Sequence, residues 1–271
     1  AQDPRGNTRL HHSVIKNDVE ALILLVQNGA NQHIQNCNGW TPQALAKLLG
    51  RKNCIKHFTL HDLPWISFHD KVSGLISALT IKEFEKLFEI EYLQQLRFDS
   101  LNILSKAEKC AKYHLGNPEN PGNAIVPDEA ILKWIRANNS TPIWKDFLIK
   151  WVNDEIGYGL FTNRNLMIGE YIGEYLGEII GHKNTKFNDY LYYYHQTPDP
   201  ENVLYISAEN SGNHTRFINH SSDPNILGSI FCFDGLLHQI FFVRTNIPKG
   251  KQLTYNYGKV FWENRKKPLS I

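Results

Sequence analysis

The chain has 271 residues, more than one average domain, and 42% of them are hydrophobic, which is enough for packed cores. The 29 basic and 27 acidic side chains leave a formal net charge of +2, which excludes a strongly basic nucleic-acid-binding protein, so we expect no direct nucleic-acid binding. No apolar run reaches about eighteen residues, the length of a membrane-spanning helix, and we expect no membrane partner.

Residues 1–62 contain two copies of one unit. Gly6 and Thr8 in the first copy correspond to Gly39 and Thr41 in the second, at one constant offset. Residues 19–31 carry leucines at helical spacing and end in a Gly-Ala exit. Because this offset equals the ankyrin period of about 33 residues, the region resembles ankyrin repeats, a resemblance that implies protein-binding contacts. The second copy departs from the usual pattern and has a shorter second helix.

Two such repeats cannot cover their own apolar faces, because each repeat is stabilised mainly by its neighbours. We expect residues 63–141 to form a helical connector that packs on the last repeat. Apolar residues recur at helical spacing in 77–96 and 98–115, and Thr80 is a candidate N-cap. A further helix is expected to begin at Pro127.

The four cysteines are Cys37, Cys54, Cys110 and Cys232, and they form no CxxC pair. Short cysteine spacing is typical of zinc or redox centres. We therefore expect no metal site, and reduced, mostly buried thiols in an intracellular protein.

From about residue 143 the sequence changes to short β-rich runs separated by Gly, Asn, Asp and Pro, which predicts a compact β-rich domain. Three motifs follow in order: GYG at 157–159, RFINHSSDPN at 216–225 and TYNYG at 254–258. Their joint order and spacing resemble the SET-domain protein lysine methyltransferases over residues 142–262. Another small barrel is the alternative for the β-rich pattern alone.

The resemblance implies an α+β fold, in which a β-rich SET fold with a C-terminal pseudoknot follows the repeats (1–62) and the connector (63–141). Residues 263–271 would be a C-terminal tail. It also implies S-adenosylmethionine as cofactor and a protein lysine as substrate, with a histone tail favoured and non-histone proteins as the alternative. Ankyrin repeats with a SET domain resemble eukaryotic chromatin-modifying enzymes and effectors of intracellular bacteria. The expected location is therefore the nucleus or cytoplasm, or the host nucleus for an effector.

The resemblance assigns eight residues to the cofactor. Glycines let the main chain approach a ligand closely, the side chain of Asn219 would meet the cofactor's amino group, and the backbone of His220 would meet the adenine. Tyr190 either reaches the cofactor carboxylate or packs in a strand, and Arg216 either lies near the cofactor or supports the threaded segment. The residues so assigned are Gly157, Tyr158, Gly159, Tyr190, Arg216, Asn219, His220 and Trp262.

Three residues are assigned to catalysis by the resemblance. The hydroxyl of Tyr257 would lie where methyl, sulfur and amine meet, and would orient the amine for in-line displacement. Tyr175 would help to form the channel for the lysine stem. Phe242 falls where the family chooses between Phe and Tyr. A Phe leaves room for more methyl groups and predicts di- or trimethylation, although a shift of one residue would place Phe241 there instead.

Two departures from the family pattern concern the end of the domain. Many members carry cysteines at the position of Ser222 and in the tail, where they bind zinc, and this chain lacks them. Phe261 or Trp262 would then cover the adenine or the lysine channel. The competing hypothesis is a catalytically weak SET scaffold whose ankyrin region is a protein-binding module.

Overall fold

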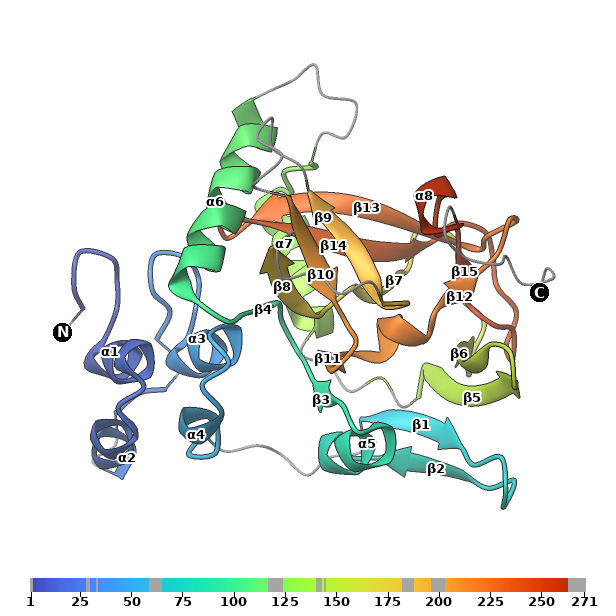
Figure 1. The fold of residues 1–271 in the computed structure, drawn as a ribbon, viewed down its shortest axis with the longest axis horizontal. Coiled ribbons are helices and arrows are strands. Elements are labelled where there is room, and N and C mark those ends of the chain that lie inside the picture. Colours follow the sequence, from blue (N-terminus) through green and yellow to red (C-terminus); the bar gives the residue numbers. More distant parts are fainter. Residues whose placement is uncertain are drawn as a thin grey trace.

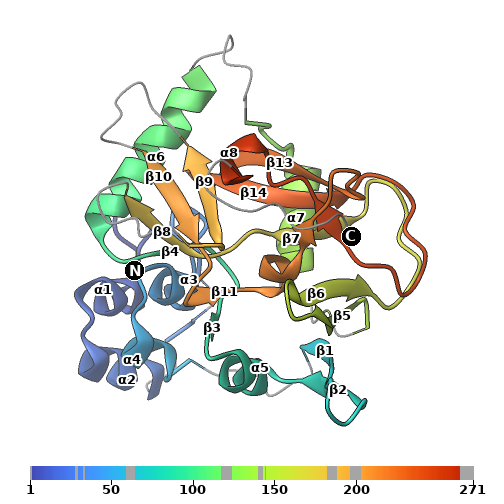
Figure 2. The ribbon, with the colours of Figure 1, turned by 45° about the vertical axis from the view of Figure 1, so that its right-hand side comes forward.

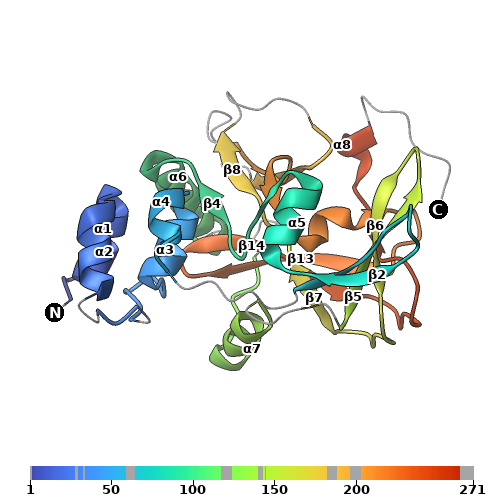
Figure 3. The ribbon, with the colours of Figure 1, turned by 90° about the horizontal axis from the view of Figure 1, so that it is seen from below.

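The structure is a computed structural model, and it describes residues 2–27, 30–32, 34–58, 65–116, 124–139, 143, 145–181, 188–195 and 203–262. Helices of the N-terminal region lie at one end of the molecule and small twisted sheets make up the rest (Figure 1). The N-terminal helices are α1 (Arg9–Lys16), α2 (Val19–Gln27), α3 (Pro42–Leu48) and α4 (Lys52–Ile55). They form two pairs, α1 with α2 and α3 with α4, and the first pair packs on the second through α1 against α3 and α2 against α4. Both pairs lie at the end of the molecule far from α8 and β6 (Figure 3).

The two turns that precede these helix pairs have the same conformation. The side chain of Asp3 accepts hydrogen bonds from the backbone two and four residues further on, and Asn36 does the same. Gly6 and Gly39 both have left-handed backbone, with φ of 74° and 80°. Positions that correspond in the two sequence copies therefore also share the same backbone conformation.

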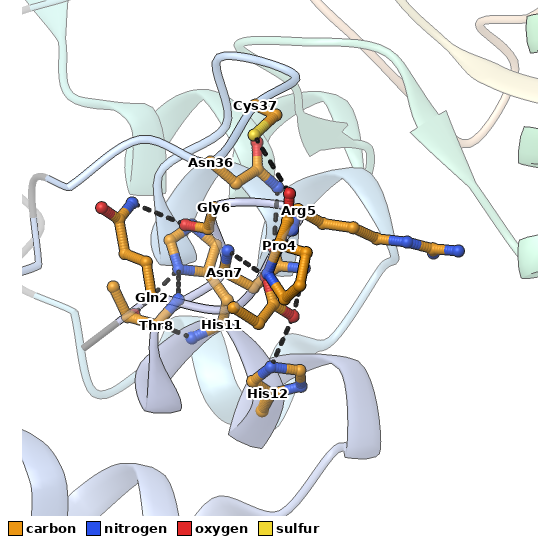
Figure 4. A network of polar contacts seen from close by, with 11 residues as sticks. Gln2, Pro4, Arg5, Gly6, Asn7, Thr8, His11, His12, Asn36 and Cys37 are labelled. Atoms are coloured by element: carbon orange, nitrogen blue, oxygen red, sulfur yellow. Dashed lines mark hydrogen bonds and ion pairs between the residues drawn. The ribbon is translucent and has the colours of Figure 1, made fainter.

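Hydrogen bonds join the two turns to each other (Figure 4). The backbone N–H of Cys37 donates to the carbonyl of Arg5 at 2.9 Å, and the Asn36 amide donates to Asn7 Oδ1 at 2.9 Å. His11 also contacts the carbonyl of Trp40 at 2.8 Å through Nε2. The helix pairs are thus fixed in one relative position.

The connector caps the second helix pair, as the sequence predicts. Its strand β4 (Arg97–Phe98) lies beside α3, and β3 (Glu91–Tyr92) is linked to α4 by an ion pair. Gln95 donates a hydrogen bond to the carbonyl of Ala44, and Lys52 pairs with Glu91 at 2.8 Å.

The prediction of a helical connector is wrong in two places. Residues 66–79 form a hairpin of β1 (Ile66–His69) and β2 (Ile76–Leu79), and β3 and β4 are also strands. Strand β1 pairs in parallel with β5, which lies much later in the chain. Local spacing cannot show such a partner, and runs this short do not identify a strand by periodicity.

The other connector elements are helical, as predicted: α5 (Ile81–Phe88), α6 (Leu101–Gly116) and α7 (Glu129–Asn139). Thr80 caps α5, because its hydroxyl accepts the N–H of Glu83 and the Glu83 carboxylate accepts the N–H of Thr80. Helix α7 begins two residues after Pro127, where Asp128 Oδ1 accepts the N–H of Ile131 at 2.8 Å.

The β-rich region consists of several small sheets (Figure 2). The sheet orders are β2-β1-β5-β6, β4-β8-β10-β9 and β13-β14-β7, with two-stranded pairs β11-β3 and β12-β15. The elements are β5 (Phe147–Asn153), β6 (Gly157–Thr162), β7 (Tyr171–Glu174), β8 (Glu178–Gly181), β9 (Leu191–His195), β10 (Leu204–Ser207), β11 (Ser211–Gly212), the 3-10 helix η3 (His214–Phe217), β12 (Asn219–His220), β13 (Ile226–Phe233), β14 (Leu236–Val243), β15 (Thr254–Tyr255) and α8 (Lys259–Trp262).

One continuous apolar core runs from the helix pairs into the sheets, and includes Leu10, Leu48, Phe84, Ile149 and Phe241. None of the four cysteines forms a disulfide among the described residues; Cys54, Cys110 and Cys232 are buried and Cys37 is exposed. Within the described ranges, no helix is long and apolar enough to cross a membrane, and no group of three or more His, Cys, Asp or Glu side chains could hold a metal ion.

Candidate active site

Two of the sequence motifs meet in a parallel strand pair. Strand β12 runs beside β15, with Asn219 opposite Thr254 and His220 opposite Tyr255. Asn225 fixes this pairing, since its amide donates to the Gln252 carbonyl at 2.8 Å and its Oδ1 accepts the N–H of Thr254 at 2.9 Å. The RFINH and TYNYG segments are therefore held side by side.

The remaining motif, GYG, lies at the start of β6 and contacts the same strand pair. The Asn219 side chain donates to the carbonyl of Tyr158 at 3.2 Å. Gly157 has φ of 77° and lines a cleft, whereas Gly159 does not line it. A Cβ on Gly159 would lie 2.6 Å from Gln252 Nε2 and 3.0 Å from Asn219 Nδ2. Gly159 therefore provides room for the Asn219 amide, rather than the direct approach to a ligand that we expected.

The cleft has a volume of about 1510 Å³ and is lined mainly by parts of the three motifs and by two other segments. The main contributors are residues 88–90, 155–158, 189–194, 216–220, 255–259 and 261–262. Sites for one small molecule commonly measure about 300–1,000 Å³. This cleft has room for a nucleotide-sized ligand together with a side chain from a second molecule.

Tyr257, in the TYNYG segment, is hydrogen-bonded to the RFINH segment. Its hydroxyl donates to the carbonyl of Ile218 at 2.9 Å, and its N–H donates to His220 Nδ1 at 3.2 Å. Burial raises the pKa of the Tyr257 hydroxyl well above its ordinary value, and the nearby Tyr190 and Asp189 raise it further. The hydroxyl therefore stays protonated at neutral pH and can act as a donor.

The buried Tyr175 and the partly buried Tyr255 lie close to Tyr257. Tyr175 is 5% exposed and donates from its hydroxyl to the carbonyl of Tyr190 at 2.9 Å. The ring of Tyr255 lies 4.7 Å from that of Tyr257, and burial raises the pKa of both the Tyr175 and the Tyr255 hydroxyls. Sequence reasoning did not single out Tyr255. The available signal was its place two residues before Tyr257, the spacing of one face in extended chain.

The structure does not bring Phe242 to this cleft. Its ring packs in a separate cluster, at 6.2 Å from Trp134 and 6.1 Å from Tyr171. Neighbouring residues of a strand point to opposite faces, and Phe241 is fully buried with its ring 4.9 Å from Tyr255. Of the two alternatives that the sequence left open, Phe241 lies on the side of the tyrosines.

Arg216 and Tyr190 form one wall of the cleft. The guanidinium carbon of Arg216 lies 3.8 Å over the Tyr190 ring, and its Nε donates to the carbonyl of Ala208 at 2.9 Å. Burial lowers the pKa of Arg216 from its ordinary value. Arg216 therefore both supports the backbone and places a cation beside the tyrosines.

Helix α8 covers one end of the cleft with two aromatic rings. The Trp262 indole lies 4.8 Å from the His220 ring and is stacked on Tyr257 at 6.1 Å, and Phe261 lies 4.6 Å from Tyr257. In the described part of the chain, the buried Nε1–H of Trp262 has no acceptor. Buried polar groups are nearly always hydrogen-bonded, so this donor fits a site that receives a polar ligand.

Comparison with known proteins finds a family match over the region that contains the three motifs. Residues 157–258 match the family model of the SET domain. The variant-silencing SET domain-containing protein of Plasmodium falciparum (isolate 3D7) is 32% identical over 131 residues, which cover 44% of this chain and 5% of that protein. Histone-lysine N-methyltransferase 2B of Homo sapiens is 31% identical over 188 residues, which cover 61% of this chain and 6% of that protein. The chain thus spans about one twentieth of the length of these curated relatives.

A solved structure shares the fold over a longer stretch. The crystal structure of ATXR5 in complex with histone H3.1 has a TM-score of 0.54 and 18% identity, and the match covers 73% of this chain and 94% of that chain. The likeness therefore extends beyond the segment 157–258 that matches the family model. Residues 157–258 thus match the SET domain, and they lie within a larger region that shares the fold of ATXR5.

Proposed function

We propose that this protein is an S-adenosylmethionine-dependent protein-lysine N-methyltransferase. The observation that carries the proposal is the convergence of three distant segments on one cleft: Gly157 and Tyr158, Asn219 and His220, and Tyr257. The cleft is large enough for the cofactor and a lysine side chain together.

The residues present fit the cofactor. Gly157 lines the cleft and the Asn219 amide lies beside it. The indole N–H of Trp262, which has no acceptor among the described residues, would donate to a polar atom. Gly157, Asn219, His220 and Trp262 would hold the cofactor, which supplies a methyl group activated by a sulfonium. Tyr158 and Arg216 would support this half of the cleft from its walls.

The tyrosines would prepare the amine of the target lysine. A free lysine has a pKa of about 10.4, and burial favours the neutral, nucleophilic form. The hydroxyls of Tyr175 and Tyr257 stay protonated, so they orient the amine rather than remove its proton. Most of the rate enhancement would come from alignment and exclusion of water.

Tyr255 would decide how many methyl groups are added. Its ring lines the cleft beside Tyr257, and its hydroxyl has no hydrogen bond to any described residue. Such a hydroxyl can hold the amine or a water molecule and leaves less room for a methylated amine. Monomethylation replaces the di- or trimethylation expected from Phe242, because Phe242 lies outside the cleft.

A histone tail is the proposed substrate. The relatives include enzymes named for histone lysine, and ATXR5 was crystallised with histone H3.1. Acidic side chains of Glu155, Asp189 and Glu209 line the cleft, where they would favour a basic peptide. Non-histone proteins remain the alternative.

We also propose that the two N-terminal helix pairs are ankyrin repeats that recruit protein partners. The two matching turns, joined to each other by hydrogen bonds, support this assignment.

The parallel pairing of β12 with β15 supports a pseudoknot in the SET fold. Because β1 joins the sheet of β5, the catalytic unit would begin near residue 65 rather than at 142, and the tail (263–271) lies outside the described residues. The location would be the nucleus or cytoplasm, or a host nucleus for an effector.

The test is incubation with methyl-labelled S-adenosylmethionine and separate pools of core histones, nucleosomes and cell lysate, with Tyr257→Phe as the control. Label on a histone lysine, absent in the variant, is expected. Label only in the lysate would exclude histones as the substrate. Cofactor binding without any label would favour the scaffold hypothesis, in which the repeats carry the function.

A further inference from the structure

One wall of the cleft is built by residues far outside the segment that matches the SET domain. Phe88, Glu89 and Ile90 line the cleft at the end of α5, long before the match begins at 157. In Figure 2, α5 and the β1–β2 hairpin lie against the β5–β6 part of the fold. This wall is therefore part of the site and not only a link between the repeats and the SET domain.

The ring of Phe88 contacts both segments assigned to the cofactor. It lies edge-on to Tyr158 at 5.4 Å and tilted against Phe217 at 4.9 Å. Tyr158 is the middle residue of the GYG motif, and Phe217 lies two residues before Asn219. These segments are joined directly where Asn219 donates to the Tyr158 carbonyl. Phe88 packs against both segments next to this hydrogen bond.

The position of Phe88 is itself fixed. Thr80 and Glu83 cap the start of α5, and Glu89 ends it in left-handed backbone with φ of 54°. The carboxylate of Glu85 accepts the N–H of Tyr92 at 2.9 Å, which ties the helix to β3. Phe84 anchors the helix in the core with its ring 4.9 Å from that of Phe88.

We propose that Phe88 is a positioning residue of the cofactor site, which holds Tyr158 and Phe217 so that Gly157 and Asn219 face the ligand; this rests on the proposed methyltransferase function. Each aromatic pair contributes stability beyond that of apolar burial. Loss of the ring releases both loops at once, although Phe88 transfers no group and touches no reacting atom.

The test compares Phe88→Ala and Phe88→Leu with Leu87→Ala in the full chain, by calorimetric titration with S-adenosylhomocysteine and by steady-state kinetics. Leu87 is the matched control, because it is the adjacent residue of α5, is 45% exposed and does not line the cleft. We expect Phe88→Ala to raise the Kd, and the KM for S-adenosylmethionine, by about tenfold or more, with the KM for peptide unchanged. Phe88→Leu, which keeps the apolar bulk, should lose about three- to tenfold, and Leu87→Ala should match the wild type.

The possible results separate the two proposals. A folded Phe88→Ala or Phe88→Leu with the wild-type Kd would refute the role of Phe88 and leave the methyltransferase proposal standing. A fall in kcat with both KM values unchanged would also refute it, since that is the result of a loss of folded protein alone. Wild-type protein that does not bind S-adenosylhomocysteine would overturn the proposed function, and this inference with it.

Discussion

Gly159→Ala should weaken cofactor binding in a protein that still folds. The backbone of Gly159 does not require glycine, because its φ lies outside the left-handed region. The added methyl group would instead meet three side-chain atoms, at 2.6 Å from Gln252, 2.9 Å from Val152 and 3.0 Å from Asn219. The perturbation therefore acts on the packing behind the cleft and not on the course of β6.

The distances set the size of the effect. To reach an ordinary contact of about 3.4 Å, Gln252 must retreat by about 0.8 Å and Asn219 by about 0.4 Å. The bond from Asn219 to the Tyr158 carbonyl is already 3.2 Å long, so a retreat of this size would weaken or break it. Overpacking of this kind costs about 1–3 kcal/mol of stability, and displacement of the amide should weaken cofactor binding by about tenfold or more.

The assay is titration with S-adenosylhomocysteine alongside thermal unfolding. Gly181→Ala is the matched control, because Gly181 also lies in a strand, lacks left-handed backbone and would place its Cβ 3.8 Å from the nearest atom. We expect the control to keep the wild-type Kd and Tm, and Gly159→Ala to bind more weakly with a Tm lower by a few degrees. Wild-type affinity in a folded Gly159→Ala protein would refute the assignment of Gly159 and Asn219.

Three further measurements test the site and the fold. Tyr257→Phe should lower kcat by about a hundredfold or more with the cofactor Kd little changed, as measured by single-turnover kinetics and titration; equal activity would exclude a role for the hydroxyl. Tyr255→Phe should raise the number of methyl groups per lysine seen by mass spectrometry, and an unchanged product would show that Tyr255 does not limit it. Burial lowers the pKa of His214 to about 4, so the folded state keeps this group neutral while the unfolded state gains a proton below about pH 6.5. Stability should thus fall by about 3 kcal/mol as the pH falls from 6.5 to 4, and denaturant unfolding of His214→Gln should show a shallower fall; equal slopes would contradict the assigned pKa.

Local signals in the sequence determined several elements correctly. Thr80 predicted the start of α5, because an N-cap residue bonds to backbone only three residues further along the chain. The constant offset between the two N-terminal copies predicted two similar turns, since each turn is formed by hydrogen bonds between near neighbours in the chain. The joint order of the three motifs led us to expect one shared site, and the structure brings parts of all three to one cleft.

Only the tertiary structure decided which side chains enter the site. Alternation places Phe241 and Phe242 on opposite faces of β14, but the choice between them depends on which face meets Tyr255. The β1–β2 hairpin and Phe88 gain their roles from partners that lie far along the chain, β5 for the hairpin and Tyr158 for Phe88. Caps and turns are fixed by interactions between neighbours in the chain, and sequence patterns record them. Sheet pairing and ring packing join distant segments, so they are fixed only when the whole chain is folded.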